Sequence, residues 1–145
     1  MKRLALLLSI AGVLACGSDQ SCTEIACEND ATVSYSGMTI QGAYDLVVST
    51  ELDQDAEHTF MARCSDPGAP ELADNDPEVR CTASGFELTG AAAVGHSVYV
   101  TILPVEGDPV AESVEVFLNV VETHAPNGED CEPVCYSRTG TLIFS

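Results

Sequence analysis

Apolar and polar residues alternate along several short runs of this chain, and this period of two limits the folds that it can adopt. The clearest run is VYVTI at 98–102, and similar runs cover 44–49, 114–121 and 141–144. Successive side chains of a β-strand point to opposite faces of its sheet, so each run predicts a half-buried strand. No stretch after residue 15 shows the sustained spacing of three and four that marks an amphipathic helix.

Turn-forming pairs separate the runs, among them Ser36-Gly37, Asp76-Pro77 and Asn127-Gly128, the last of which suits a turn with positive φ. They divide the chain into about eight expected strands. These lie near 31–35, 38–49, 57–64, 79–83, 85–89, 96–104, 112–122 and 138–145. The pattern predicts an all-β fold, a single antiparallel β-sandwich with immunoglobulin-like Greek-key connections. A closed β-barrel is the alternative.

The N-terminus has the layout of a secretory leader. Lys2 and Arg3 precede an apolar core, 4–14, which is too short to cross a bilayer as a helix. Val13-Leu14-Ala15-Cys16 resembles the lipobox of bacterial lipoproteins. The resemblance implies that Cys16 receives a diacylglyceryl group and that the leader is cut before it. The alternative is an ordinary leader cut after Ala15, which would leave Cys16 as a free thiol.

The position after Cys16 is Gly17 rather than aspartate. By resemblance to Gram-negative lipoproteins, this implies sorting to the outer membrane. The expected organisation is a cleaved signal peptide at 1–15, a polar acidic tether at 16–30 and a β-sandwich domain at 31–145. Beyond Cys16 the tether carries two cysteines, so we expect its distal half to be held against the domain.

Cysteine counting supports an exported domain with three disulfides. If Cys16 carries lipid, six cysteines remain, namely Cys22, Cys27, Cys64, Cys81, Cys131 and Cys135. An even number outside the cytoplasm is typical of a disulfide framework. Zinc thiolate sites belong mainly to reducing compartments, so we expect disulfides rather than metal.

Cys64 and Cys81 flank a loop-like segment, 65–78, and we expect them to pair. The other four cysteines come just before the first and last expected strands. If those two strands run side by side in parallel, Cys22 and Cys27 would pair with Cys131 and Cys135, the arrangement that we favour. Two local bonds, one within each of these cysteine pairs, are the alternative.

The charge of the chain excludes one class of partner. Without residues 1–15, three arginines stand against 23 acidic residues, a net charge of −20, and no lysine remains. Such a surface repels nucleic acid and anionic headgroups. Solubility or a salty medium is the simplest explanation, and a basic protein or a cation is a possible partner.

Two acidic clusters are weak calcium candidates, one with Asp53 and Asp55 and one with Asp74 and Asp76. Calcium binds several carboxylate and carbonyl oxygens at flexible geometry. Neither cluster has the spacing of an EF-hand loop, so solvated loop charge is the favoured interpretation. No other cofactor is expected.

Motifs for catalysis are weak. His58, His96 and His124 are far apart along the chain, and neither Gly-x-Ser-x-Gly nor His-Glu-x-x-His occurs. Without lysine, the mature chain cannot form a Ser–Lys dyad or a Schiff base. We therefore expect that the protein is not an enzyme.

The run PNGEDCEPVC at 126–135 resembles a P-N-G-x-x-C-x-P-x-C signature near the C-terminus of small acidic lipoproteins of Gram-negative bacteria. This resemblance implies a lipid-anchored β-domain and carries no activity. The expected function is a structural or protein-interaction module at the cell envelope. A calcium- or cation-dependent ligand-binding or adhesion domain is the alternative, and an enzyme is the least favoured class.

Intact mass of the membrane-extracted protein tests the assignment of all seven cysteines. We expect a chain that begins at Cys16, carries acyl mass there and lacks six hydrogens, because the remaining cysteines pair. An unmodified N-terminus, or a free thiol at Cys16, would contradict the lipoprotein assignment.

Overall fold

A computed structural model describes residues 25–38, 40–53, 56–65, 76–128 and 130–144 of the chain. These residues form strands and turns, together with one short 3-10 helix, η1. The elements are β1 (Asp30–Ser36), β2 (Tyr44–Asp53), β3 (Ala56–Cys64), β4 (Val79–Thr82), β5 (Gly85–Thr89), η1 (Gly90–Ala93), β6 (Ser97–Pro104), β7 (Ala111–Phe117), β8 (Asn119–His124) and β9 (Cys135–Ile143). The all-β prediction is confirmed, with nine described strands where about eight were expected.

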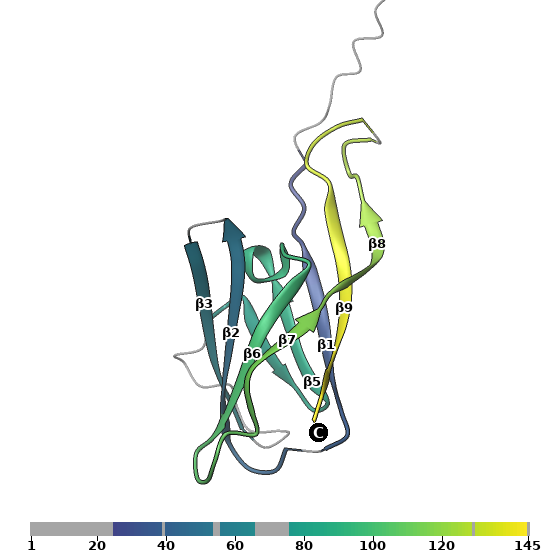
Figure 1. Ribbon diagram of the computed structural model, residues 1–145. Coiled ribbons are helices and arrows are strands. Elements are labelled where there is room, and N and C mark those ends of the chain that lie inside the picture. The colour runs from purple at the N-terminus through teal and green to yellow at the C-terminus, as the bar shows by residue number, and fades with distance from the viewer. Residues whose placement is uncertain (1–24, 39, 54–55, 66–75, 129, 145) are drawn as a thin grey trace, which may run out of the picture.

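The strands form two sheets, with the orders β4-β5-β1-β9-β8 and β3-β2-β6-β7 (Figure 1). Every pair is antiparallel except β1 with β9, whose register runs in parallel from Asp30↔Ser137 to Ser36↔Ile143. The first sheet is therefore mixed, because this one pair departs from the antiparallel sandwich that was predicted. The parallel pairing of the first and last strands is the arrangement from which the crossed disulfides were predicted.

The expected strand at 112–122 is wrong, because the chain changes sheets within it. β7 pairs with β6, whereas β8 pairs with β9 in the other sheet. Leu118 lies between them, and its backbone N–H donates to the His96 carbonyl at 2.8 Å. Val116 and Leu118 are both buried, so the alternation continues across the change of sheet. A period of two cannot show this change, because both sheets face one core.

The core consists of the alternating apolar residues of both sheets. One sheet contributes Leu46 and Val48 from β2 with Val98, Val100 and Ile102 from β6, and the other contributes Val33, Phe86, Leu88 and Leu142. Burial of a side chain of this size stabilises the fold by about 1.5–3 kcal/mol. The inward positions predicted for β2 and β6 are therefore the buried ones.

Two disulfides join described cysteines. Cys64–Cys81 links the end of β3 to β4, the edge strands of the two sheets, and is the pair predicted from the sequence. Cys27–Cys135 links the segment before β1 to the start of β9, which rules out both local pairs. Cys131 is also disulfide-bonded, and Cys22 lies outside the described residues.

Asn127 holds the segment before β1 in place. Its Oδ1 accepts a hydrogen bond from the Ile25 N–H at 2.9 Å, and its Nδ2 donates to the carbonyls of Ile25 and Glu132 at 3.1 and 2.9 Å. Gly128 beside it has φ +110°, so the expected positive φ in this turn is confirmed. The part of the tether from residue 25 onward is therefore fixed to the domain by Asn127 and by Cys27–Cys135.

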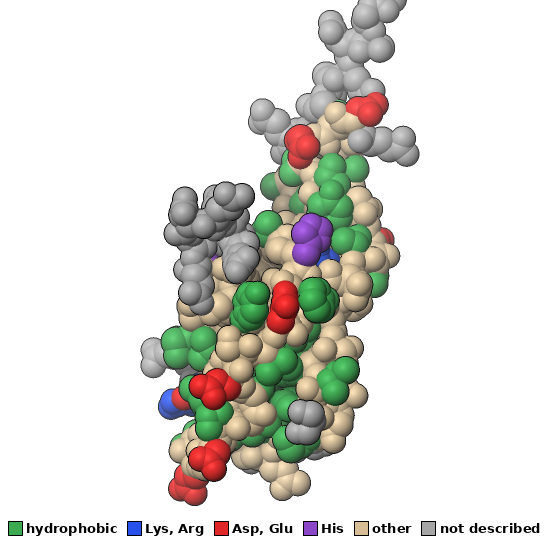
Figure 2. Space-filling model, in the orientation of Figure 1, with side chains coloured by type: hydrophobic (Ala, Val, Ile, Leu, Met, Phe, Trp, Pro, Cys, Tyr) green, Lys and Arg blue, Asp and Glu red, His purple; other side chains and the backbone are tan. Residues whose placement is uncertain are grey.

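Several large apolar side chains remain exposed on β7, β8 and β9. β8 is exposed at all of its positions, including Val120 and Val121, and the β8–β9 hairpin extends beyond the rest of the domain (Figure 1). Phe117 and Ile143 are 66% and 68% exposed. Figure 2 shows hydrophobic side chains, in green, interspersed with acidic ones on this face of the molecule.

Candidate functional site

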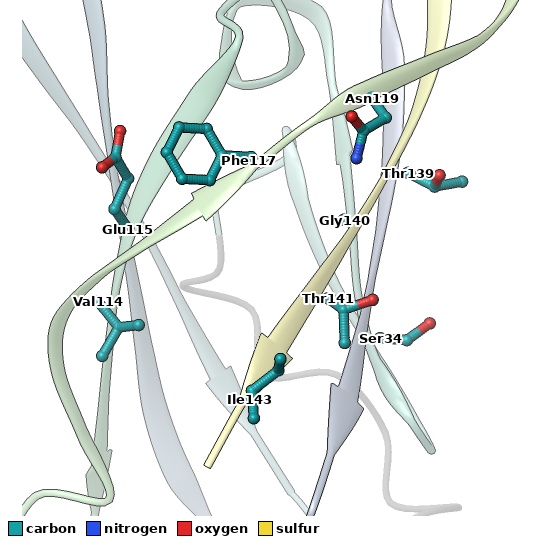
Figure 3. A pocket seen from close by; sticks show the side chains of 9 residues that line it. All are labelled: Ser34, Val114, Glu115, Phe117, Asn119, Thr139, Gly140, Thr141 and Ile143. Atoms are coloured by element: carbon teal, nitrogen blue, oxygen red, sulfur yellow. The ribbon is translucent and has the colours of Figure 1, made fainter. Parts of the chain in front are cut away.

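A groove of about 500 Å³ opens where β7 and β9 diverge (Figure 3). Its walls come from β1, β7, the start of β8 and β9. The lining residues are Ser34, Val114, Glu115, Phe117, Asn119, Thr139, Gly140, Thr141 and Ile143. The volume is in the range of pockets that hold small molecules or a few side chains of a partner.

The groove exists because β8 covers only part of β9. The β8–β9 register starts at Asn119↔Thr139 and runs toward Cys135, away from Gly140–Ile143. Before Asn119 the chain belongs to the other sheet, so no described strand pairs with Gly140–Ile143 on the side opposite β1. β7 in turn pairs only with β6 among the described strands. Two strand edges therefore bound the groove.

Gly140 lies at the narrow end of the groove, where β9 passes closest to the crossing chain. A Cβ at this position would lie 2.9 Å from Val116 Cγ1, 3.0 Å from Leu118 Cδ2 and 3.1 Å from the Phe117 carbonyl oxygen. Any side chain there would have to shift the Val116 and Leu118 side chains and would press on the Phe117 carbonyl. Glycine at position 140 therefore permits the close approach from which the two strands separate.

The side chains of the groove offer hydrogen bonds along one wall and apolar contacts at both ends. Thr139 and Thr141 point outward from β9, and Thr141 lies beside Ser34 of β1 (Figure 3). Phe117 on β7 and Ile143 near the end of β9 supply exposed apolar surface. Glu115 is the one charged residue of the lining. The groove therefore carries a negative charge among weakly polar and apolar side chains.

The three arginines of the described chain are each engaged with acceptors or an aromatic ring. Arg63 donates two hydrogen bonds to Asp45, at 2.6 and 2.9 Å, and thereby holds the pKa of the Asp45 carboxyl below its usual value. Arg80 lies 3.7 Å from Glu87. Arg138 is buried, donates to the Ala93 carbonyl at 2.7 Å and lies over the Tyr136 ring.

His124 is the histidine that comes nearest to a catalytic arrangement. Its Nε2 lies 3.4 Å from Ser137 Oγ and 3.7 Å from Glu122 Oε1. Ser137 Oγ instead donates to Asp30 Oδ1 at 2.7 Å. In a nucleophilic triad the serine and the carboxylate contact different ring nitrogens, and the serine proton goes to histidine. This exposed cluster does not have that geometry.

The other two histidines contribute no further polar group to the groove. His58 is exposed on β3, and His96 is exposed just before β6, where its carbonyl accepts from Leu118. Neither lines the groove.

The weak calcium candidates are only partly described. Asp76 Oδ1 accepts from the Glu78 N–H at 3.2 Å, and Glu78 Oε2 accepts from the Ala92 N–H at 2.9 Å, so both carboxylates hold turns. Asp53 lies at the end of β2, its side chain undescribed, and Asp55 and Asp74 lie outside the described residues. The described part of the chain contains no cluster of three or more His, Cys, Asp or Glu suited to a metal ion.

An aromatic cluster closes the end of the sandwich opposite the tether. Tyr35 packs against Tyr44, Phe86 and Phe144, and the hydroxyls of Tyr35 and Tyr44 lie 3.1 Å apart. Burial, and then the hydrogen bond to Tyr44, raises the pKa of Tyr35 far above its usual range. Burial also raises the pKa of Tyr44. The hydroxyl groups of Tyr35 and Tyr44 therefore stay neutral, and the two rings contribute to packing.

Comparison of the chain with known protein families, with curated proteins and with solved structures gives no significant match. The described residues include no helix that is long and apolar enough to cross a bilayer. Cys16, which the sequence analysis predicts to carry lipid, lies outside the described residues.

Sequence reasoning missed the groove residues. One available signal was Gly140, because an isolated glycine inside a strand pattern often marks a close approach of backbone.

The close approach at Gly140 predicts a strong effect of one added methyl group. Gly140→Ala should lower the free energy of unfolding by about 1–3 kcal/mol, because its Cβ overlaps β7. Thr141→Ala, one residue along on the exposed face, should change it by less than about 1 kcal/mol. Urea unfolding followed by circular dichroism measures both. Equal stability of Gly140→Ala and wild type would contradict the geometry of the crossing.

Proposed function

We propose that the mature chain is a lipid-anchored domain of the cell envelope, at the outer membrane of a Gram-negative bacterium, and that it acts as a protein-interaction module. The leader and Cys16 support the anchor. The groove between β7 and β9 supports the interaction, since it exposes Phe117 and Ile143 beside two strand edges. Exposed apolar and aromatic groups with polar neighbours are typical of binding surfaces.

The position of the groove relative to the tether supports this assignment. The tether is fixed to the start of β9 by Cys27–Cys135, whereas the groove lies along Gly140–Ile143 near the end of that strand. At about 3.3 Å per residue, five to eight residues of β9 separate the two by roughly 17–26 Å. A domain held at Cys16 would therefore present the groove away from its attachment.

The fold that we propose for the domain is an immunoglobulin-like Greek key. The order β4-β5-β1 corresponds to strands D, E and B of such a sandwich, and β3-β2-β6-β7 corresponds to C′, C, F and G. β9 then lies beside β1, where strand A would lie, but runs parallel to it. The likeness is one of strand order, because the chain has no tryptophan and Cys64–Cys81 joins β3 to β4 rather than strands B and F.

We also propose Cys22–Cys131 as the third disulfide. Cys131 is disulfide-bonded, and the other described cysteines of the domain are paired with one another. Together with Cys27–Cys135, this bond would tie the tether to the C-terminal hairpin twice.

Two such bonds close almost the same long loop, so their effects on stability should not add. Cys27→Ser with Cys135→Ser should cost about 2–3 kcal/mol rather than the roughly 4.7 kcal/mol of an independent loop of this length, because the second bond still closes the chain. Urea unfolding of the oxidised variant measures this. A loss near the larger value would show that no second bond spans these segments.

Site-specific photocrosslinking tests the groove as an interface. A photoreactive residue in place of Phe117, in the full chain in its own bacterium, should give a light-dependent adduct with one protein that mass spectrometry identifies. The control is Val105, which is 61% exposed but does not line the groove. Adducts of equal yield from both positions, or none from Phe117, would contradict the proposed interface.

A further inference from the structure

The edge of β9 along Gly140–Ile143 is suited to accept another strand. β1 pairs with one side of Gly140–Ile143 in parallel register. On the other side of β9, the pairing with β8 ends at Thr139. On that second side, no described strand pairs with the backbone. The groove lies directly against this edge, so an extended chain could lie there in the position that β8 would occupy if it continued. An exposed row of N–H and C=O groups is a template for strand addition.

The other edges of the two sheets are interrupted. β8 has a register shift between Val120 and Glu122, and β7 has one facing Val100–Ile102, where Ser113 takes φ +50°. Bulges of this kind twist an edge away from further pairing.

The remaining two edges do not line the groove. β4 is no longer than Gly140–Ile143, and on β3 the Met61 carbonyl already accepts a hydrogen bond from the Asp76 N–H. The short, regular edge at Gly140–Ile143 is therefore the one best suited to pair with another chain.

The acidic residues in and near the groove favour a basic partner. Glu115 lines the groove, and Glu106 and Asp108 are exposed before the start of β7. The arginines are already engaged with acceptors or an aromatic ring. A second copy of this chain would bring another large negative charge and be repelled, whereas a basic segment would be attracted.

Resting on the function proposed above, we propose that the groove binds an extended, lysine- or arginine-bearing segment of a protein. This segment adds antiparallel to Gly140–Ile143 as a further strand of the first sheet. Its backbone bonds β9, and its alternate side chains contact Phe117 and Ile143. A basic side chain of the segment pairs with Glu115. This is recognition by strand addition, in which the backbone gives affinity and the pockets give specificity.

Synthetic peptides test this chemistry on the full lipidated chain in neutral detergent. The probe is an acetylated peptide of about ten residues that alternates valine with threonine and carries three lysines. One matched peptide carries glutamates in place of the lysines, and another carries N-methyl groups at alternate backbone positions. Isothermal titration calorimetry gives affinity, and amide hydrogen exchange followed by NMR locates the bound strand.

The lysine peptide should bind about tenfold more tightly than the glutamate peptide at low salt, with the difference shrinking as salt is raised. The N-methyl peptide should bind about tenfold more weakly than its parent, because it lacks ladder donors. Amide exchange should slow within Gly140–Ile143. Equal binding of the lysine and glutamate peptides, or protection centred on β8, would overturn the proposal.

Two charge reversals on β7 give a matched pair of variants. Glu115→Lys, in the groove lining, should weaken binding of the lysine peptide about fivefold and strengthen binding of the glutamate peptide. Glu112→Lys makes the same charge change on the same strand but outside the lining, and should change either affinity by less than about twofold. Equal effects of the two variants would show attraction to net charge rather than to the groove.

The outcomes separate this proposal from the one on which it rests. An identified adduct at Phe117 with no peptide binding at Gly140–Ile143 leaves the interaction module in place and overturns strand addition. Peptide binding without any adduct at Phe117 would contradict the proposed interface in the cell, but strand addition at the groove would still be supported. Concentration-dependent dimerisation through the groove, measured by sedimentation, would overturn the basic partner in favour of a second copy.

Discussion

The parallel pairing of β1 with β9 is the constraint on which the rest of this structure depends. It places the first and last strands of the domain at the centre of one sheet, between β5 and β8. Because both strands run the same way, their starts lie at the same end of the molecule. That end is where Cys27 bonds Cys135 and where Asn127 holds Ile25. The tether and the C-terminal hairpin are thus joined by backbone pairing, side-chain hydrogen bonds and a covalent bond.

The groove follows from the same pairing together with the change of sheet at Leu118. β9 continues alongside β1 to Ile143, but the chain that pairs with its other edge arrives from β7 in the opposite sheet. Gly140 lets β7 and β9 approach each other closely where they cross, and the two strands separate from there toward Ile143. The candidate site is therefore a by-product of strand connectivity, and its lining is assembled from residues that are far apart in the sequence.

Much of the architecture was predictable because it is local or periodic. The alternation at 98–102 identified β6 and its buried face, and the loop-like composition of 65–78 pointed to the Cys64–Cys81 pair. The change of sheet was not predictable, since Val116 and Leu118 face the core on both sides of it. The groove depends on the register at which β8 stops pairing with β9, and no local pattern carries that information.

The covalent link between Cys27 and Cys135 has a mechanical consequence for a domain held by its N-terminus. A pull exerted by a partner bound to Gly140–Ile143 enters β9 directly and leaves through the bond at Cys135 into the segment that begins the domain. The load path runs along β9 and through Cys27–Cys135, and the proposed Cys22–Cys131 bond would lie on the same path. Tension between the proposed anchor and the proposed partner would bypass the packed interior, which can keep its shape while the link is under load.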